Sequence, residues 1–241
     1  MSRRYWFAAT ALLPLLLFVP STAQTPNNAD QNTPAALTSA YNQAMQAKDW
    51  PAAIAAAQQL AGASSTSANL LLLGNAQLYG GAAEKSLVTY DSALAAAQQD
   101  KPAEGQPDTA WKDGVSRIYI GKGNALLKLK RNAEAIDAYN RSAELASNPA
   151  LAYWNICAVM FNIGDTQNGP AACRKAVQVE PTRANAWFVL GSMLFADAKI
   201  DAQGKVAISA ECRQALDKYL ELAPDGPHAS DVKAMLQMAA Q

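Results

Sequence analysis

Apolar residues recur at helical spacing along most of the chain, and the short amphipathic segments that they mark repeat every 34 residues. One aromatic position recurs at this spacing as Tyr119, Tyr153 and Trp187. A small residue follows four positions after each of them. A fixed period of this length predicts a solenoid of helix-turn-helix units, because one unit cannot bury its apolar face alone.

The period divides the chain into five repeats, residues 33–66, 67–100, 116–149, 150–183 and 184–226. Residues 101–115 interrupt it, and we interpret them as a surface loop or a lengthened helix end. Trp111 in this insertion is expected to pack back on the array, the alternative being that it anchors a partner. Extra residues within the fifth repeat, at 199–209, resemble a small β-hairpin. Residues 227–241 predict one more amphipathic helix, which would cap the array.

The first 23 residues have the pattern of a signal peptide. Arg3 and Arg4 precede an apolar run over 6–19, and the small residues 21–23 predict cleavage after Ala23. An uncut membrane anchor is the alternative, but the run is shorter than the roughly 20 residues that a span needs. We therefore expect no membrane span after leader cleavage.

Residues 24–32, rich in Asn, Gln and Pro, predict a disordered spacer between the leader and the array. Export leads to an oxidising compartment where disulfides persist. The combination of leader and repeat array favours a periplasmic protein, with secretion from a eukaryotic cell left open.

Composition argues against nucleic-acid binding and against catalysis. The formal net charge is zero, so the chain lacks the basic excess that a nucleic-acid partner requires. Its single histidine, His228, has no Cys, Asp or Glu cluster beside it, and no glycine-rich phosphate loop is present. We expect no enzyme activity, no metal and no cofactor.

The repeats carry a recognisable residue pattern. The first half of a repeat carries an aromatic, a leucine, a small residue and another leucine, seen in the fifth repeat as Trp187, Leu190, Gly191 and Leu194. The second half ends on small residues and a proline, seen in the fourth repeat as Gly169, Cys173, Ala176 and Pro181. This pattern resembles the tetratricopeptide repeat (TPR) family. The resemblance implies an all-α fold, a right-handed α-solenoid of about five repeats plus a C-terminal capping helix.

The resemblance also implies a concave groove, lined by the first helix of each repeat, that binds a peptide or a helical segment of a partner protein. The family's groove positions include asparagines and aromatic or apolar residues in this sequence, namely Asn75, Asn124, Asn155, Trp154, Phe161, Phe188, Phe195 and Leu127. An amide both donates and accepts hydrogen bonds, as a peptide backbone requires. Exposed aromatics commonly carry binding affinity. The alternative interpretation is that the asparagines are solvated and the apolar residues belong to the core.

Some family members hold a C-terminal carboxylate through basic groove residues. Here the matching positions hold Ile120, Asn185 and Val189. We therefore favour binding of an internal or hydrophobic segment.

Two of the three cysteines lie at equal distances from the turn of the fourth repeat. Cys157 and Cys173 are each eight residues from Asp165, so an antiparallel hairpin places them face to face. We hypothesise that they form a disulfide. The alternatives are two small buried residues and a Cys173–Cys212 pair.

These features predict an exported, monomeric, non-enzymatic scaffold that binds another protein in its groove. The alternative is a structural subunit of an envelope complex that assembles, or associates with itself, through its convex face or its cap helix.

Overall fold

A computed structural model describes residues 32–200, 202 and 206–239. The predicted signal peptide and all but the last residue of the predicted spacer lie outside the described residues. The described elements, in chain order, are α2 (Pro34–Ala47), α3 (Trp50–Ala63), α4 (Ser67–Tyr79), α5 (Ala83–Gln99), α6 (Thr109–Lys128), α7 (Asn132–Leu145), α8 (Ala150–Ile163), α9 (Gly169–Val179), α10 (Ala184–Ala196), β1 (Lys199–Ile200), β2 (Val206–Ala207), α11 (Ala210–Leu222) and α12 (Ala229–Met238).

Local sequence signals set several helix ends. The side chains of Thr33, Thr66 and Ser209 each accept a hydrogen bond from a backbone N–H in the first turn of the helix that follows. At the other end, Gly164 closes α8 with a φ of 75°, a left-handed conformation that glycine adopts without steric cost. These signals explain why the helices begin and end close to the predicted turns.

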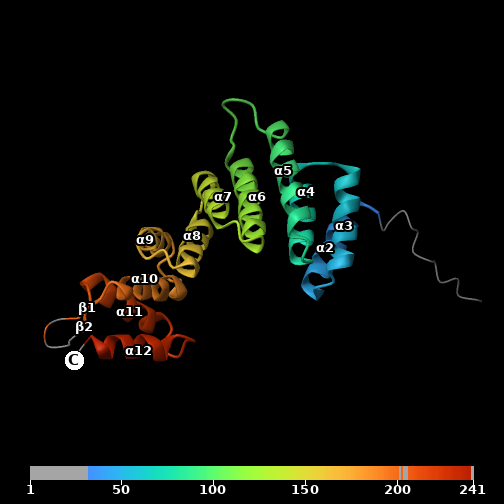
Figure 1. Cartoon of the computed structure of the whole chain (residues 1–241). Coiled ribbons are helices and arrows are strands. Elements are labelled where there is room, and N and C mark those ends of the chain that lie inside the picture. Colours follow the sequence, from blue (N-terminus) through green and yellow to red (C-terminus); the bar gives the residue numbers. More distant parts are fainter. Residues whose placement is uncertain (1–31, 201, 203–205, 240–241) are drawn as a thin grey trace, which may run out of the picture.

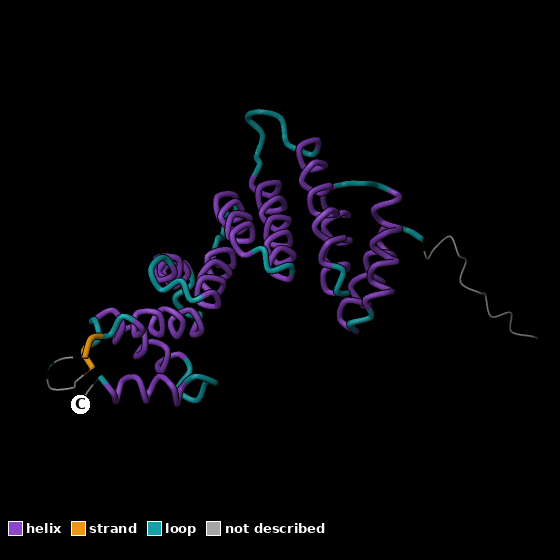
Figure 2. Tube along the Cα trace, viewed as in Figure 1, coloured by secondary structure: helices purple, strands orange, loops and turns teal. Residues whose placement is uncertain are grey.

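The helices form five antiparallel hairpins that stack in sequence order, followed by the single helix α12 (Figures 1 and 2). Each hairpin contacts the next through its second helix, as α3 contacts α4 and α5 contacts α6. The predicted all-α solenoid with a terminal helix is confirmed. The short strands pair antiparallel, with Lys199 opposite Ala207, and add a minor ribbon between α10 and α11.

The first helices lie on the inner side of this stack. Helix α4 contacts α6 directly, and α8 contacts α10. Within the described part of the chain, no two second helices make more than marginal contact. Neighbouring elements approach more closely on the inside of a curve than on its outside, so this asymmetry identifies the first helices as the concave layer.

Only part of the predicted insertion at 101–115 lies outside a helix. Helix α6 begins at Thr109, so the lengthened helix end accounts for the second half of the stretch. Trp111 packs back on the array: its indole N–H donates a hydrogen bond to the carbonyl oxygen of Ala97 over 2.8 Å. The ring also packs against the buried cluster of α5 and α6.

In the second and third hairpins, a glycine on the first helix faces a buried tyrosine on the second. A Cβ atom added to Gly74 would lie 2.6 Å from the Tyr90 ring, and one added to Gly123 would lie 2.4 Å from the Tyr139 ring. Neither tyrosine is accessible to solvent. Any side chain at these glycines would displace the ring, so glycine is required for close helix packing. We call each such pair of facing residues an interlock pair.

The first and last hairpins have interlock pairs of different composition. In the last hairpin, Gly191 faces Leu216, and an added Cβ atom would lie 2.6 Å from that leucine. In the first hairpin the order of sizes is reversed, with Tyr41 on the first helix and Ala57 on the second, both in one buried cluster. In the last hairpin a large residue therefore meets a small one, and in the first hairpin a large and a small residue share one buried cluster.

The cysteines of the fourth hairpin are joined. Cys157 of α8 and Cys173 of α9 form a disulfide, with their Cα atoms 4.7 Å apart. Cys212 is a buried free thiol in α11, and its Sγ atom donates to the carbonyl oxygen of Gly191 over 3.4 Å. Burial raises the pKa of the Cys212 thiol to about 11, so it stays protonated at neutral pH.

None of the described helices has both the length and the apolar character that crossing a lipid bilayer requires.

Candidate peptide-binding groove

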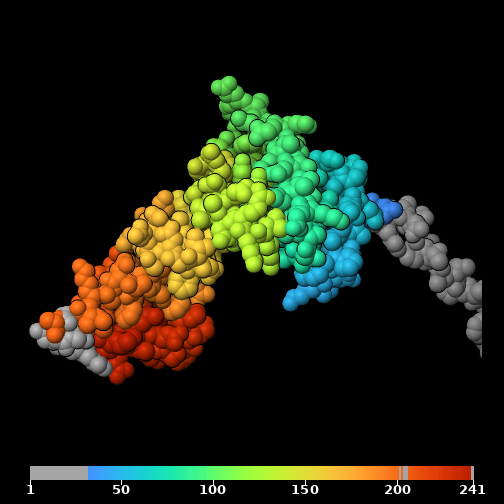
Figure 3. Space-filling view, viewed as in Figure 1, coloured from blue at the N-terminus to red at the C-terminus, as the bar shows by residue number. Residues whose placement is uncertain are grey.

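An apolar opening on the inner layer lies at the C-terminal ends of α4 and α6. It has a volume of about 630 Å³ and includes the start of α5. Its lining combines apolar side chains with one amide and two charged groups, and the residues are Leu78, Tyr79, Gly81, Ala83, Glu84, Asn124, Leu127, Lys128 and Leu129. The space-filling view shows the array hollowed on its lower side, where these helix ends lie (Figures 1 and 3).

Tyr79 is the aromatic residue in the lining of this pocket, and 57% of its surface is exposed. Its ring stacks on Trp50 of the preceding hairpin, with centroids 6.0 Å apart and planes 22° apart. The stack holds a large apolar ring in position at the pocket edge while leaving much of it exposed. Such a ring loses little freedom when it binds a partner, which favours affinity.

Two of the predicted groove asparagines are held by the tyrosines of the interlock pairs. Tyr90 donates its hydroxyl hydrogen to Oδ1 of Asn75 over 2.8 Å, and Tyr139 donates to Oδ1 of Asn124 over 2.7 Å. Burial raises the pKa of both tyrosines above the ordinary value for a phenol, so both remain donors at neutral pH.

These hydrogen bonds occupy the acceptor oxygen of each amide and do not use its N–H donors. The carbonyl oxygen already accepts from a tyrosine, whereas the two hydrogens of the NH₂ group are not used in that bond. Burial raises the pKa of Tyr41, and the nearby Asn75 amide offsets part of this rise. The pair of asparagines is therefore suited to donate hydrogen bonds to carbonyl oxygens, more than to accept from N–H groups.

The predicted aromatic patch in the second half of the groove is largely covered by the protein itself. The ring of His228 lies flat on Phe188, with centroids 3.8 Å apart and planes 4° apart. The backbone N–H of His228 donates to the hydroxyl of Tyr219 over 2.9 Å, which holds the linker before α12 against α11. The expectation of an open aromatic surface at Phe188 is corrected accordingly.

The other aromatics of this half are also engaged. Phe195 is half-buried against the cluster that includes Val232 of the cap helix. The Arg183 guanidinium lies over the Trp154 ring, 5.5 Å from its centroid. Phe161 contacts Phe188 edge-on and remains 38% exposed. Asn155, also on α8, is half-buried. This half therefore presents the rim of Phe161 rather than a broad aromatic patch.

Solved structures with the same arrangement of helices are known, although no known protein family and no curated protein matches the sequence. The chain is similar to YrrB, a TPR protein with an unusual peptide-binding site, with a TM-score of 0.56 and 17% identity over 86% of this chain and 95% of that one. A tetratricopeptide repeat protein from Parabacteroides merdae gives a TM-score of 0.57 and 14% identity over 85% and 73%. The chain has the tetratricopeptide repeat fold. MamA is a further neighbour, with a TM-score of 0.58 and 18% identity over 81% and 93%.

The TPR register explains why His228 covers Phe188. With the extra residues of the fifth repeat counted, Pro227 begins a sixth TPR repeat, of which α12 is the first helix. His228 then takes the second position of that repeat, which faces the groove in the TPR fold. The repeat bounds in the sequence already give His228 this position, but they do not show that its ring stacks on Phe188.

Several residues of the TPR groove were not singled out from the sequence. Leu78, Glu84, Lys128 and Leu129 join Asn124 and Leu127 in the pocket because the C-terminal ends of two first helices meet the start of α5 there. That meeting depends on the angle between hairpins, which the repeat period does not encode. Among residues 32–200, 202 and 206–239, no group of three or more His, Cys, Asp or Glu residues is placed to hold a metal ion.

Proposed function

We propose that this TPR-fold chain is a non-enzymatic periplasmic scaffold that binds a peptide or helical segment of a partner protein in the half of its groove formed by the second and third hairpins. The observation that carries the proposal is the open pocket of about 630 Å³ between Tyr79 and Leu127, whose lining includes Asn124 held by Tyr139. The similarity to YrrB, a TPR protein with a peptide-binding site, supports the same function class.

The chemistry of the pocket defines the segment that fits. Leucine side chains and the exposed Tyr79 ring favour an apolar side chain of the partner. The amide of Asn124 has N–H donors for a backbone carbonyl. Glu84 and Lys128 supply one charge of each sign, so recognition depends on shape and apolar burial more than on net charge.

The proposed location rests on the leader pattern of residues 1–23 and on the disulfide of the fourth hairpin, which an oxidising compartment preserves. In that compartment the scaffold acts as a monomer, because an open groove is free for a partner only when a second copy does not fill it.

We expect Tyr79→Ala to abolish most partner capture while leaving the fold intact. A central aromatic anchor typically contributes 2 kcal/mol or more, about a thirtyfold loss of affinity. The measurement is capture from an envelope extract by the immobilised chain that begins at Gln24, with bound proteins quantified by mass spectrometry. Circular dichroism of the variant verifies its helical content.

Val88→Ala is the matched control. Val88 is 67% exposed, but it lies on the second helix α5, away from the inner layer. The proposal requires that Val88→Ala captures the same partner as the wild type. Loss of capture by Val88→Ala, with Tyr79→Ala unaffected, would instead support the structural subunit that assembles through its convex face.

A further inference from the structure

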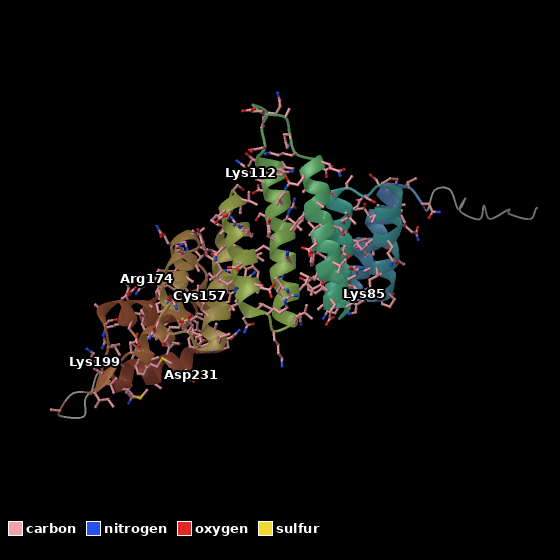
Figure 4. All side chains as sticks on the ribbon, turned by 45° about the horizontal axis from the view of Figure 1, so that its top comes forward. Lys85, Lys112, Cys157, Arg174, Lys199 and Asp231 are labelled. Atoms are coloured by element: carbon pink, nitrogen blue, oxygen red, sulfur yellow. A yellow bond between two sulfur atoms is a disulfide. The ribbon has the colours of Figure 1, made fainter. Side chains whose placement is uncertain are left out.

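Cysteines occupy the interlock pair of the fourth hairpin. In the second and third hairpins the two interlock residues are 16 positions apart, as Gly74 is from Tyr90. Cys157 and Cys173 have the same separation of 16, and neither is accessible to solvent. Figure 4 marks Cys157 on α8, in the C-terminal half of the array. The disulfide therefore lies at the level where the other hairpins pack a large side chain against a small one.

Two cysteines cannot reproduce that packing without the covalent bond. The bond holds α8 and α9 with Cα atoms 4.7 Å apart at this level, towards the short end of the range of about 4.4–6.8 Å that disulfides permit. Two separate thiols need van der Waals distance between their sulfurs. Reduction must therefore move the helices apart or turn a side chain, and either change disturbs a close-packed core.

The same hairpin joins the two halves of the groove. First helices contact each other from α4 to α6 and from α8 to α10, but α6 and α8 make at most marginal contact within the described residues. The fourth hairpin is attached to the third mainly by α7 packing on α8. In a solenoid, stability passes only between neighbours, so a weakened unit separates the units on either side of it.

We infer that the Cys157–Cys173 disulfide replaces the glycine–tyrosine interlock and makes the ordered packing of the fourth hairpin, and with it the connection between the two halves of the groove, dependent on oxidation. A dithiol reductant opens the bond by supplying two electrons and two protons. The disulfide becomes two thiols, and the reductant is itself oxidised to a disulfide. This dependence belongs to the array itself and does not require the proposed ligand.

The test compares the oxidised chain, the chain reduced with dithiothreitol, and three variants. Cys157→Ser with Cys173→Ser removes the bond. Cys157→Gly with Ala158→Asn and Cys173→Tyr transplants the Gly-Asn and Tyr arrangement of the second and third hairpins. The flexible side chain of Met193, whose Sδ atom lies 3.7 Å from Cys173 Sγ, can shift to admit the tyrosine ring. Cys212→Ala is the control for the third cysteine.

We expect reduction and the double serine variant each to lower Tm by about 5–10 °C, from the loop of 16 residues that the bond closes. Amide hydrogen exchange in α8 and α9 should become at least roughly tenfold faster, while α2 to α5 change little. The transplanted interlock should restore Tm to within roughly 3 °C of the oxidised chain and remove the response to dithiothreitol. Cys212→Ala should respond to reduction as the wild type does.

Each contrary result overturns a defined part of the inference. Reduced wild type that melts and exchanges as the oxidised chain does would show that the fourth hairpin does not depend on the bond. A transplanted interlock that melts as low as the double serine variant would show that the disulfide does not stand in place of the glycine–tyrosine pair. The comparison of oxidised with reduced protein uses the wild-type chain alone. Its result therefore does not depend on whether the variants fold.

Discussion

Tyr139→Ala should lower the free energy of unfolding by about 3–5 kcal/mol, the range for removing a large buried aromatic side chain. The ring is inaccessible to solvent and packs against Gly123, which has no side chain to fill the space left behind. The substitution also removes the hydroxyl that holds Asn124 in the groove. Urea unfolding followed by circular dichroism measures the loss.

Tyr139→Phe is the matched control for this prediction. It keeps the ring and deletes only the hydrogen bond to Asn124, so it should cost about 1 kcal/mol. Equal stabilities of the alanine and phenylalanine variants would show that ring packing against Gly123 does not hold the third hairpin together.

Phe188→Ala should detach the C-terminal cap and cost about 2–4 kcal/mol, somewhat less than a fully buried aromatic because Phe188 is only half-buried. The ring contacts His228, Tyr219 and Phe161 at once. Its loss removes the surface on which the linker before α12 rests. Hydrogen exchange should report faster opening of α12 and of the C-terminal end of α11, with α4 and α6 unaffected.

Phe161→Ala is the comparison that separates cap packing from groove function. Phe161 contacts the same ring from the exposed side, so its removal should cost less than about 1 kcal/mol. If Phe188→Ala left the exchange of α12 unchanged, His228 and Phe188 would not hold the cap, and the second half of the groove would be open after all.

The repeat period was enough to predict the hairpins, because stacking units must present apolar residues at the same positions each time. Gly123 and Gly191 mark where helices approach closely, and the sequence shows them at the same step of the period as Cys157. The spacing of Cys157 and Cys173 supported the hypothesis of their disulfide, since an antiparallel hairpin brings residues equidistant from its turn to one level, but it left two unbonded cysteines and a Cys173–Cys212 pair as alternatives.

The groove itself was less predictable, because it depends on how hairpins are angled and on what else packs there. Composition at the groove positions indicated an aromatic patch around Phe188, but the linker between α11 and α12 places His228 on that ring. The side-chain amides of Asn75 and Asn124 were expected both to donate hydrogen bonds to a partner and to accept them from it. Tyrosines 15 residues further along take up their acceptor oxygens, a contact that single groove positions do not reveal.

We propose that partners dock on the inner layer, at the open pocket of the second and third hairpins. Site-specific photocrosslinking tests it most directly, with p-benzoylphenylalanine placed at position 79 or at position 88 of the chain expressed in its own compartment. Both positions are well exposed, one beside the pocket and one on the second helix α5. We expect a discrete crosslinked partner from position 79 and none from position 88. A partner crosslinked from position 88 alone would contradict it.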